Sequence, residues 1–232
     1  MRKTTVYHLT LAEKVALKEY IKDGLKQGTL WRSEAPHACF FFFIDKKDGK
    51  LWPVQDYQPL NAITVKNAAP IPLIPELVDK LLGVQFFTKL DVWWGYNNIQ
   101  VQEGNEWKTA FKTPMGLYES TIMTFGLCNA PAMFQTFMDI EFGPLIKEGH
   151  VIVYLDDILI YAATIMELLH WTHKVFQLPM KLDLYLQPAK CSFNQTSVEY
   201  LGLIILEGEL HMDPVKLKAV KEWPWPKKIK DI

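Results

Sequence analysis

The stretch Val151-Ile-Val-Tyr-Leu-Asp-Asp-Ile-Leu-Ile-Tyr161 decides how this 232-residue chain is interpreted. Two apolar runs of strand length flank Leu155-Asp156-Asp157, which predicts a tight hairpin with two adjacent carboxylates at its tip. Unpaired carboxylates are costly to bury, so these need water, a cationic side chain or a metal ion. Taken alone, an Asp pair is more often a solvated turn, and that alternative stays open here.

A third carboxylate, Asp91, ends another apolar run, Phe86-Phe-Thr-Lys-Leu-Asp91. If the two strand ends adjoin in the fold, three acidic side chains meet at one place. Carboxylate oxygens are the ligands that Mg²⁺ prefers. The arrangement suits two ions about 3.5–4 Å apart, which activate an attacking hydroxyl and neutralise a transferring phosphate. The pattern is thus compatible with a two-metal site that acts on a phosphate, but taken alone it favours the solvated turn.

The composition is that of an ordinary folded protein, with 49% hydrophobic and 22% charged residues. The longest unbroken apolar run, residues 38–44, is too short for a membrane span, and no secretory leader is visible. Cys39, Cys128 and Cys191 are odd in number and widely spaced, which predicts reduced thiols in an intracellular protein. The formal net charge of −1 gives no global sign of a nucleic-acid partner.

Further patterns predict a mixed architecture. Thr10-Leu-Ala-Glu13 has the form of a capping box, and helical spacing then predicts a helix that ends near Gly28. Other helices are predicted over residues 132–142, capped by Asn129, and over residues 165–180. Strands are predicted over residues 39–44, 51–54, 86–92, 151–154, 158–161 and 198–205. Because no regular βαβ alternation is present, the predicted fold class is α+β.

Tyr154-Leu155-Asp156-Asp157 inside an apolar hairpin resembles the Tyr-x-Asp-Asp motif of reverse transcriptases. Other blocks of that family follow in the expected order: Lys46-Lys-Asp-Gly49, Asp56-Tyr57 with Leu60-Asn61, Phe87-Thr-Lys-Leu-Asp91, Gly95-Tyr-Asn97, Glu106-Trp-Lys-Thr-Ala-Phe111, Phe125-Gly-Leu-Cys-Asn-Ala-Pro131 with Phe134-Gln135, and Tyr200-Leu-Gly202. Over about residues 9–226 the chain is similar to the reverse transcriptases of gypsy-type LTR retrotransposons, and ordered agreement over so many blocks is specific.

The resemblance implies a right-hand polymerase fold, with an antiparallel palm sheet backed by helices and a mixed fingers subdomain. Residues 1–65 and 99–129 would form the fingers, and residues 66–98 and 130–207 the palm. Residues 208–232 would hold the primer-grip turn and the truncated start of the thumb. Thumb, connection and RNase H parts would belong to a full-length polyprotein, and without a thumb we expect weak binding of template and primer.

The resemblance also implies synthesis of DNA on an RNA or DNA template, in which deoxynucleoside triphosphates are added to a primer 3′-hydroxyl. No membrane partner is expected. Asp91, Asp156 and Asp157 would hold two Mg²⁺ ions, or Mn²⁺, with help from the Val92 backbone carbonyl. Lys190 would be the general acid for the departing pyrophosphate, with a surface lysine as the alternative.

The nucleotide would be bound by Lys46, Val92, Tyr96, Phe125 and Tyr154. Lys46 would reach the triphosphate as a point charge, unless it is a solvated turn lysine. Tyr96 would exclude a 2′-hydroxyl, unless it is an ordinary core aromatic. The primer grip would be Leu201-Gly202, where glycine permits close backbone approach, with a plain strand glycine as the alternative.

Trp52 and Gln58 stand where the family usually has arginine, and only Arg2 and Arg32 remain in this chain. Single C-to-T changes in CG-containing arginine codons produce both Trp and Gln, which favours a decaying element copy over ordinary divergence. A tryptophan cannot imitate the planar multi-donor contact of arginine with phosphate. The alternative function is therefore a catalytically silent remnant with weak nucleic-acid binding. A viral-type RNA-dependent RNA polymerase is a third candidate, which Tyr96 disfavours.

Overall fold

The computed structural model describes residues 6–45, 49–81, 83–206, 209–212, 214–223 and 225. The chain divides into two compact units, each built from two segments. Unit 1 comprises Met1–Pro70 and Trp94–Phe137, and unit 2 comprises Ile71–Trp93 and Met138–Ile232. Among the described residues, no helix is both long enough and apolar enough to cross a membrane.

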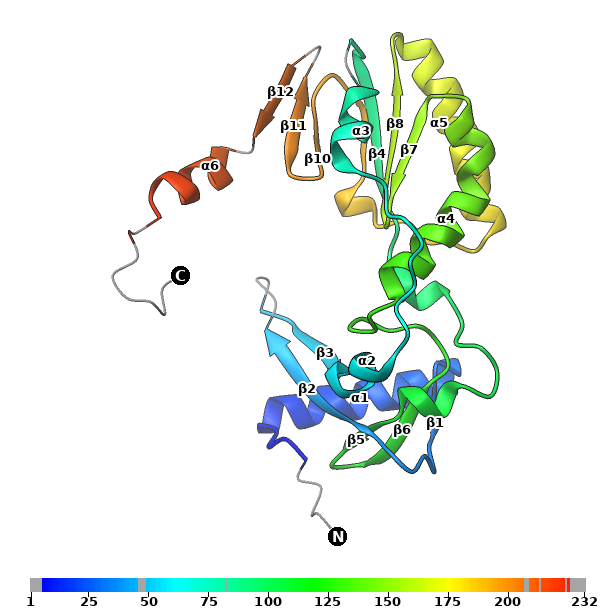
Figure 1. Ribbon diagram of the computed structural model, residues 1–232, viewed down its shortest axis with the longest axis vertical. Helices are drawn as coiled ribbons and strands as arrows, with labels where there is room; N and C mark the ends of the chain where they lie inside the picture. The colour runs from blue at the N-terminus through cyan, green and yellow to red at the C-terminus, as the bar shows by residue number, and fades with distance from the viewer. Residues whose placement is uncertain are drawn as a thin grey trace. The chain divides into compact units, whose positions relative to one another are not determined.

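Unit 1 is a five-stranded sheet with one long helix and several short ones (Figure 1). Its elements are α1 (Leu11–Gln27), β1 (Leu30–Arg32), β2 (Cys39–Asp45), β3 (Leu51–Asp56), α2 (Gln58–Ile63), η1 (Gly95–Asn98), η2 (Glu106–Thr109), β5 (Phe111–Thr113) and β6 (Gly116–Ser120). The strand order is β1-β6-β5-β2-β3, and only the β2–β5 pair is parallel. Apolar side chains of α1 and the sheet form its core, including Leu17, Ile21, Phe41, Phe111 and Tyr118.

The predicted signals of α1 are confirmed. The Thr10 side chain accepts a hydrogen bond from the Glu13 backbone N–H, and the Glu13 carboxylate accepts one from the Thr10 backbone N–H. This pair satisfies two N–H groups that the first turn leaves without a helical partner. Gly28 ends the helix at φ 75°, a left-handed conformation that glycine adopts without a side-chain clash.

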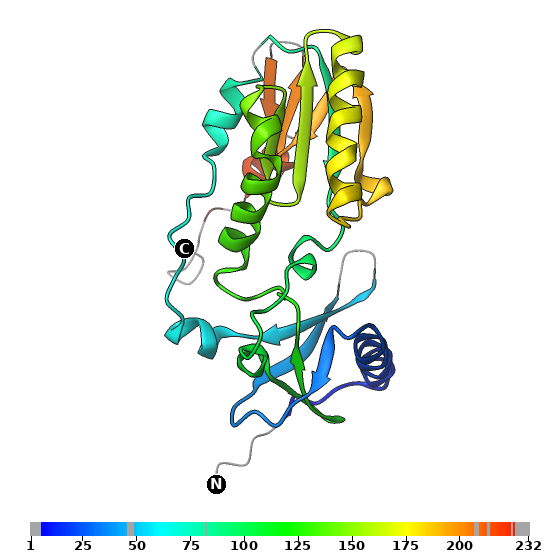
Figure 2. The same ribbon diagram turned by 90° about the vertical axis from the view of Figure 1, so that its right-hand side faces the viewer.

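Unit 2 contains the hairpin that the sequence singled out. Its first elements are α3 (Ile74–Asp79), β4 (Phe86–Asp91), β7 (Val151–Tyr154), β8 (Asp157–Ala162), α5 (Ile165–Lys181), η3 (Pro188–Lys190) and β9 (Ser192–Gln195). The sheet order is β7-β8-β4-β9, with every neighbouring pair antiparallel. Helix α5 and the end of α4 (Ala130–Lys147) lie along one face of this sheet (Figure 2). The predicted antiparallel sheet backed by helices is thus present.

A second sheet of unit 2 packs on the opposite side of β4 and β8. It consists of β10 (Val198–Tyr200), β11 (Leu203–Leu206) and β12 (Glu209–Met212), and α6 (Pro214–Lys221) follows. Val198, Tyr200 and Ile205 share one buried cluster with Phe87 and Leu159. Successive residues of a strand point to opposite faces of the sheet, so every second residue shares a face. Phe87, Lys89 and Asp91 therefore project from this face of β4.

The prediction of one strand over residues 198–205 is wrong. The chain turns back at Leu201 and Gly202, whose φ angles are 53° and 79°, so that Tyr200 pairs with Leu203. Two successive residues with positive φ form the tight turn that suits the twist of a two-residue hairpin. The apolar run continues through the turn, which is why the pattern of hydrophobic residues concealed it.

Helix α4 also differs from the prediction. It begins at Ala130 and extends to Lys147, beyond the expected 132–142, with Pro144 inside it. The Asn129 side chain does not cap it: it accepts from the Asn67 backbone N–H and donates to the Val65 backbone oxygen, both at 2.9 Å. Because Pro131 has no N–H group, the first turn offers fewer donors to a capping side chain, and Asn129 instead holds the preceding segment.

Candidate active site

The backbone brings the three predicted aspartates to one edge of the four-stranded sheet. Asp91, the last residue of β4, lies directly opposite Asp157, the first residue of β8. The Val92 N–H donates to the Asp156 backbone oxygen at 2.8 Å, which fixes the hairpin turn against the end of β4. Leu155, in the turn, has a φ of 53°, as a tight strand connection requires.

The loop after α5 supports the other side of the same strand end. The Gln187 N–H donates to the Asp91 backbone oxygen at 2.9 Å, and the Trp93 N–H donates to the Tyr185 oxygen at 2.7 Å. Val92 forms an isolated antiparallel bridge with Leu186. The backbone around Asp91 is therefore hydrogen-bonded on both sides, so the position of its side chain depends on two separate segments.

Two lysines neutralise two of the three carboxylates. The Lys190 Nζ lies 3.3 and 3.0 Å from the two Asp91 carboxylate oxygens, and Asp91 itself is only 6% exposed. The Lys89 Nζ lies 3.2 Å from Asp157 Oδ1. Desolvation by the surrounding chain raises the pKa of Asp156, and the charges of Asp157 and Asp91 raise it further, whereas Lys190 opposes the shift. Asp156 therefore lies where an additional cation would be favourable.

The donor set is suited to a hard divalent cation but is not arranged around one. Within the described ranges, no group of three or more His, Cys, Asp and Glu side chains is positioned as a metal-binding cluster. The three carboxylates nevertheless share one sheet edge, where burial first and the charges of Asp157 and Asp91 second raise the pKa of Asp156. Carboxylate oxygens are the preferred ligands of Mg²⁺. Metal ions at this edge would compete with Lys190 and Lys89 for the carboxylate oxygens of Asp91 and Asp157.

Tyr96 and Phe125, two of the predicted nucleotide contacts, belong to an aromatic cluster of unit 1. Their ring centroids are 4.9 Å apart, and Tyr96 also meets Phe134 edge-on at 5.6 Å. Trp52 stands where the resemblance leads us to expect an arginine. Its ring centroid lies 5.5 Å from that of Phe125 and 6.2 Å from that of Trp94. Phe125 keeps 42% of its surface exposed. The cluster thus presents a partly open aromatic surface.

The segment that carries Phe125 is held by one amide side chain. Asn61 donates from Nδ2 to the Gly126 backbone oxygen at 2.7 Å and accepts from the Cys128 N–H at 2.9 Å. Both bonds link α2 to the segment just before α4. These contacts give Asn61 a structural role in positioning Phe125.

Residues 44–205 match the family described as reverse transcriptase (RNA-dependent DNA polymerase). The chain belongs to this family. Two similar proteins are the transposon Tf2-3 and Tf2-7 polyproteins of Schizosaccharomyces pombe, each 37% identical over 226 residues. The match covers 97% of this chain and 17% of each polyprotein, so the chain spans only about a sixth of the length of these relatives. The predicted relationship to retrotransposon reverse transcriptases is confirmed.

Solved structures of the foamy viral protease-reverse transcriptase show the same fold. The form in complex with an RNA/DNA hybrid has a TM-score of 0.86 at 22% identity, and covers 99% of this chain and 31% of that one. The dRH form in complex with double-stranded DNA has a TM-score of 0.89 at 23% identity, with 99% and 40% covered. The predicted polymerase fold of mixed α+β class is confirmed.

Other predicted site residues of this reverse transcriptase domain have varied surroundings. Lys46 lies outside the described residues, as do Lys47 and Asp48 of the same turn. Tyr154, paired with Asp157, packs against the core shared by the two sheets of unit 2. The Lys190 side chain is 55% exposed and forms an ion pair with Asp91.

Sequence reasoning missed the cation beside Asp157 and the loop beside Asp91. The alternation of strand side chains could have identified Lys89, because a residue two positions before Asp91 shares its face. No local pattern marks residues 183–187.

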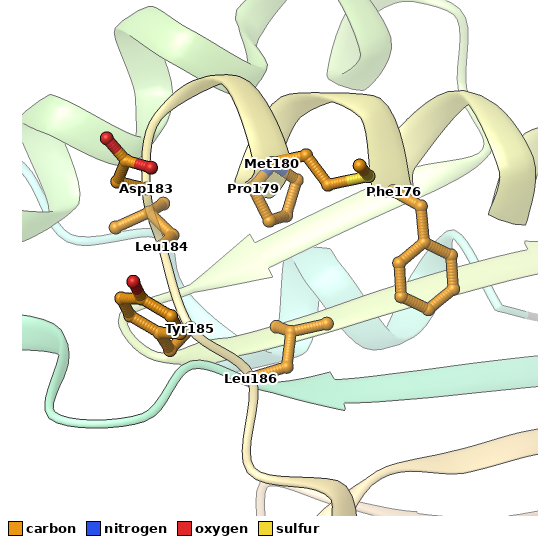
Figure 3. Close-up of a pocket in the computed structure, with 7 residues that line it drawn as sticks. All are labelled: Phe176, Pro179, Met180, Asp183, Leu184, Tyr185 and Leu186. Carbon is orange, nitrogen blue, oxygen red and sulfur yellow. The ribbon is translucent and has the colours of Figure 1, made fainter.

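Side chains of this loop and of the end of α5 line a cavity of about 310 Å³, shown in Figure 3. The cavity is mainly apolar, and none of the three aspartates lines it.

Proposed function

We propose that this chain is the polymerase portion of a retrotransposon reverse transcriptase, which extends a primer with deoxynucleotides on an RNA or DNA template. The observation that carries this proposal is the pairing of Asp91 with Asp157, together with the hydrogen bond from Val92 to Asp156. Family membership and the nucleic acid bound by the foamy viral structures support it.

Asp91, Asp156 and Asp157 are the proposed holders of two Mg²⁺ ions, or of Mn²⁺, with the Val92 carbonyl as an additional ligand. Such ions, when bound, would lower the pKa of the primer 3′-hydroxyl and offset the charge of the transferring phosphate. The chain itself fixes Asp91 and Asp157 at the ends of two paired strands and Asp156 in the tight turn beside them. A position on paired strands is more rigid than a position on a loop, which favours accurate orientation of the reacting groups.

Lys190 is proposed to protonate the departing pyrophosphate. Its ammonium group lies against Asp91, within hydrogen-bond reach of both carboxylate oxygens. Cations that bind Asp91 would release this lysine, because they compete for the same oxygens. Its side chain is exposed enough to reach toward a triphosphate on the solvent side. The same lysine would thus serve as counter-ion before the reaction and as proton donor during it.

The nucleotide and primer contacts are further proposals. Tyr96 would exclude a 2′-hydroxyl and Phe125 would pack beside the nascent base pair. Lys46 would reach the triphosphate, and Val92 and Tyr154 would complete the nucleotide contacts. Leu201-Gly202, at the tip of the β10–β11 hairpin, would approach the primer. We assign residues 1–65 and 99–129 to the fingers and residues 66–98 and 130–207 to the palm, with the start of the thumb after residue 207.

A catalytically silent remnant is the second candidate, and Trp52 favours it. The indole packs among Phe125 and Trp94, where the family usually has an arginine that contacts the triphosphate. Loss of one charge-assisted contact with phosphate costs about 1.5–3 kcal/mol, or roughly 10- to 100-fold in binding or rate. Such a loss would weaken the reaction without abolishing the chemistry of the aspartates.

Primer extension on poly-rA/oligo-dT with Mg²⁺ or Mn²⁺ distinguishes the two candidates. We expect extension by the wild-type chain and none by Asp156→Asn, which keeps the shape of the side chain but removes its charge. No extension by either protein under both metals would favour the remnant, and equal extension by both would indicate a contaminating polymerase. Tyr96→Ala should admit ribonucleotides, and unchanged sugar selectivity would contradict the assignment of Tyr96.

A further inference from the structure

Lys89 lies between the carboxylate edge and the second sheet of unit 2. It is two residues before Asp91 on β4, so both side chains project from the same face. Its Nζ contacts Asp157 Oδ1 at 3.2 Å and donates to the Glu199 backbone oxygen at 3.3 Å. One ammonium group therefore joins a carboxylate of β8 to the backbone of β10.

The surroundings of Lys89 make this contact stronger than an ordinary surface ion pair. Lys89 lies opposite Leu159 in the β4–β8 pairing, and Phe87, Leu159 and Tyr200 beside it are buried. The side chains of Lys89 and Asp157 are only 21% and 25% exposed. Exposed pairs contribute little because water screens them, whereas partly buried charges depend on their partners.

The two contacts of Lys89 link two parts of the proposed site, the metal-binding carboxylates and the hairpin proposed to approach the primer. Glu199 belongs to β10, and the turn of the β10–β11 hairpin holds Leu201 and Gly202. Asp157 is one of the three carboxylates at the sheet edge. A displacement of this hairpin would therefore pull on the group that orients Asp157.

We propose that Lys89 is a positioning residue that orients the Asp157 carboxylate and couples it to the β10–β11 hairpin. The inference rests on the proposed function and adds to it a lysine that competes with divalent cations for Asp157. Removal of the Lys89 charge has two opposite effects. Divalent cations no longer compete with an ammonium group for Asp157, but the Asp157 carboxylate loses its fixed orientation. Cation binding becomes tighter while turnover becomes slower.

The test compares Lys89→Met, which keeps the length of the side chain without its charge, with Lys89→Arg, which keeps the charge. Lys174→Met is the matched control, because Lys174 lies over the Trp171 ring at 4.2 Å rather than beside a carboxylate. Mn²⁺ binding is measured by calorimetry without nucleic acid, and kcat and the half-saturating Mg²⁺ concentration by primer extension. Thermal melting establishes that each variant is folded.

We expect Lys89→Met to bind Mn²⁺ several-fold more tightly and to lose about 10-fold or more in kcat, the loss typical of one charge-assisted bond. Lys89→Arg should restore most of both, and Lys174→Met should change neither. Lowered kcat with unchanged Mn²⁺ affinity would reduce Lys89 to a structural residue and overturn the inference. A wild-type chain that neither extends primers nor binds Mn²⁺ would instead overturn the proposed function.

Discussion

Gly95 has no room for a side chain, which predicts a specific loss of stability for Gly95→Ala. A Cβ atom at this position would lie 2.8 Å from Cζ and 3.0 Å from Cε1 of Phe134. The Phe134 ring is fully buried and is held by Tyr96 at 5.6 Å and by Phe137 at 6.2 Å. It cannot move aside without displacing these neighbours.

The size of the effect follows from two opposing contributions. Extra atoms in a packed core cost about 1–3 kcal/mol, because side chains or backbone must shift. Replacement of glycine by alanine also lowers the conformational entropy of the unfolded chain, which stabilises the fold by about 0.4–1 kcal/mol. The expected net loss for Gly95→Ala is about 1–2 kcal/mol, which in a chain of this size lowers the melting temperature by about 2–8 °C.

A double-mutant cycle that combines Gly95→Ala with Phe134→Leu, measured by urea unfolding, tests both the size of the stability loss and its steric cause. Leucine lacks the Cζ and Cε atoms that a Cβ at residue 95 would meet, so Gly95→Ala should cost much less in the Phe134→Leu background. A coupling free energy of about 1 kcal/mol or more is expected for residues in such contact. Additive effects, or a Gly95→Ala protein as stable as wild type, would refute the steric argument.

Three further predictions concern Asp156, Tyr200 and Asn61. Desolvation and neighbouring carboxylates raise the folded-state pKa of Asp156, so its ionised form destabilises the fold; Asp156→Asn should raise the melting temperature at pH 7 without divalent cations. Calorimetry should find that this gain shrinks toward about pH 4, where the unfolded carboxylate also becomes protonated, and an undiminished gain would contradict the linkage. The buried Tyr200 hydroxyl has no hydrogen-bond partner among the described residues, so Tyr200→Phe should leave the free energy of unfolding unchanged or raise it by up to about 1 kcal/mol; a clear loss in urea unfolding would reveal a partner. Asn61→Ala removes two hydrogen bonds and should cost about 1–3 kcal/mol, with faster hydrogen exchange at the Cys128 amide as the check; unchanged exchange there would show that other contacts hold the segment.

The parts of the fold with strong local signals were predictable. The capping box at Thr10 and Glu13 depends on residues three apart, and the hairpin around Asp156 depends on two adjacent apolar runs. Both are decided within a few residues, so the sequence alone contains the information. The placement of Asp91 beside the hairpin required a resemblance, because strand pairing over more than sixty residues leaves no local pattern.

The parts that failed depend on contacts distant in sequence or on competing partners. Asn129 has the side chain of a helix cap, but the segment around Asn67 takes its hydrogen bonds. The Leu201-Gly202 turn lies within an apolar run whose two halves bury their side chains in one core. The roles of Lys89 and of the loop at Tyr185 arise only when separate strands are brought together.

Cleavage of the chain by Fe²⁺ bound in place of Mg²⁺ tests most directly whether the three aspartates form one metal site. Ascorbate and peroxide generate radicals at the bound iron, and mass spectrometry locates the peptide bonds they break. We expect cuts near both Asp91 and Asp156, which excess Mg²⁺ suppresses and which Asp91→Asn abolishes. Cuts near only one of these segments, or cuts that persist in Asp91→Asn, would contradict a single metal site.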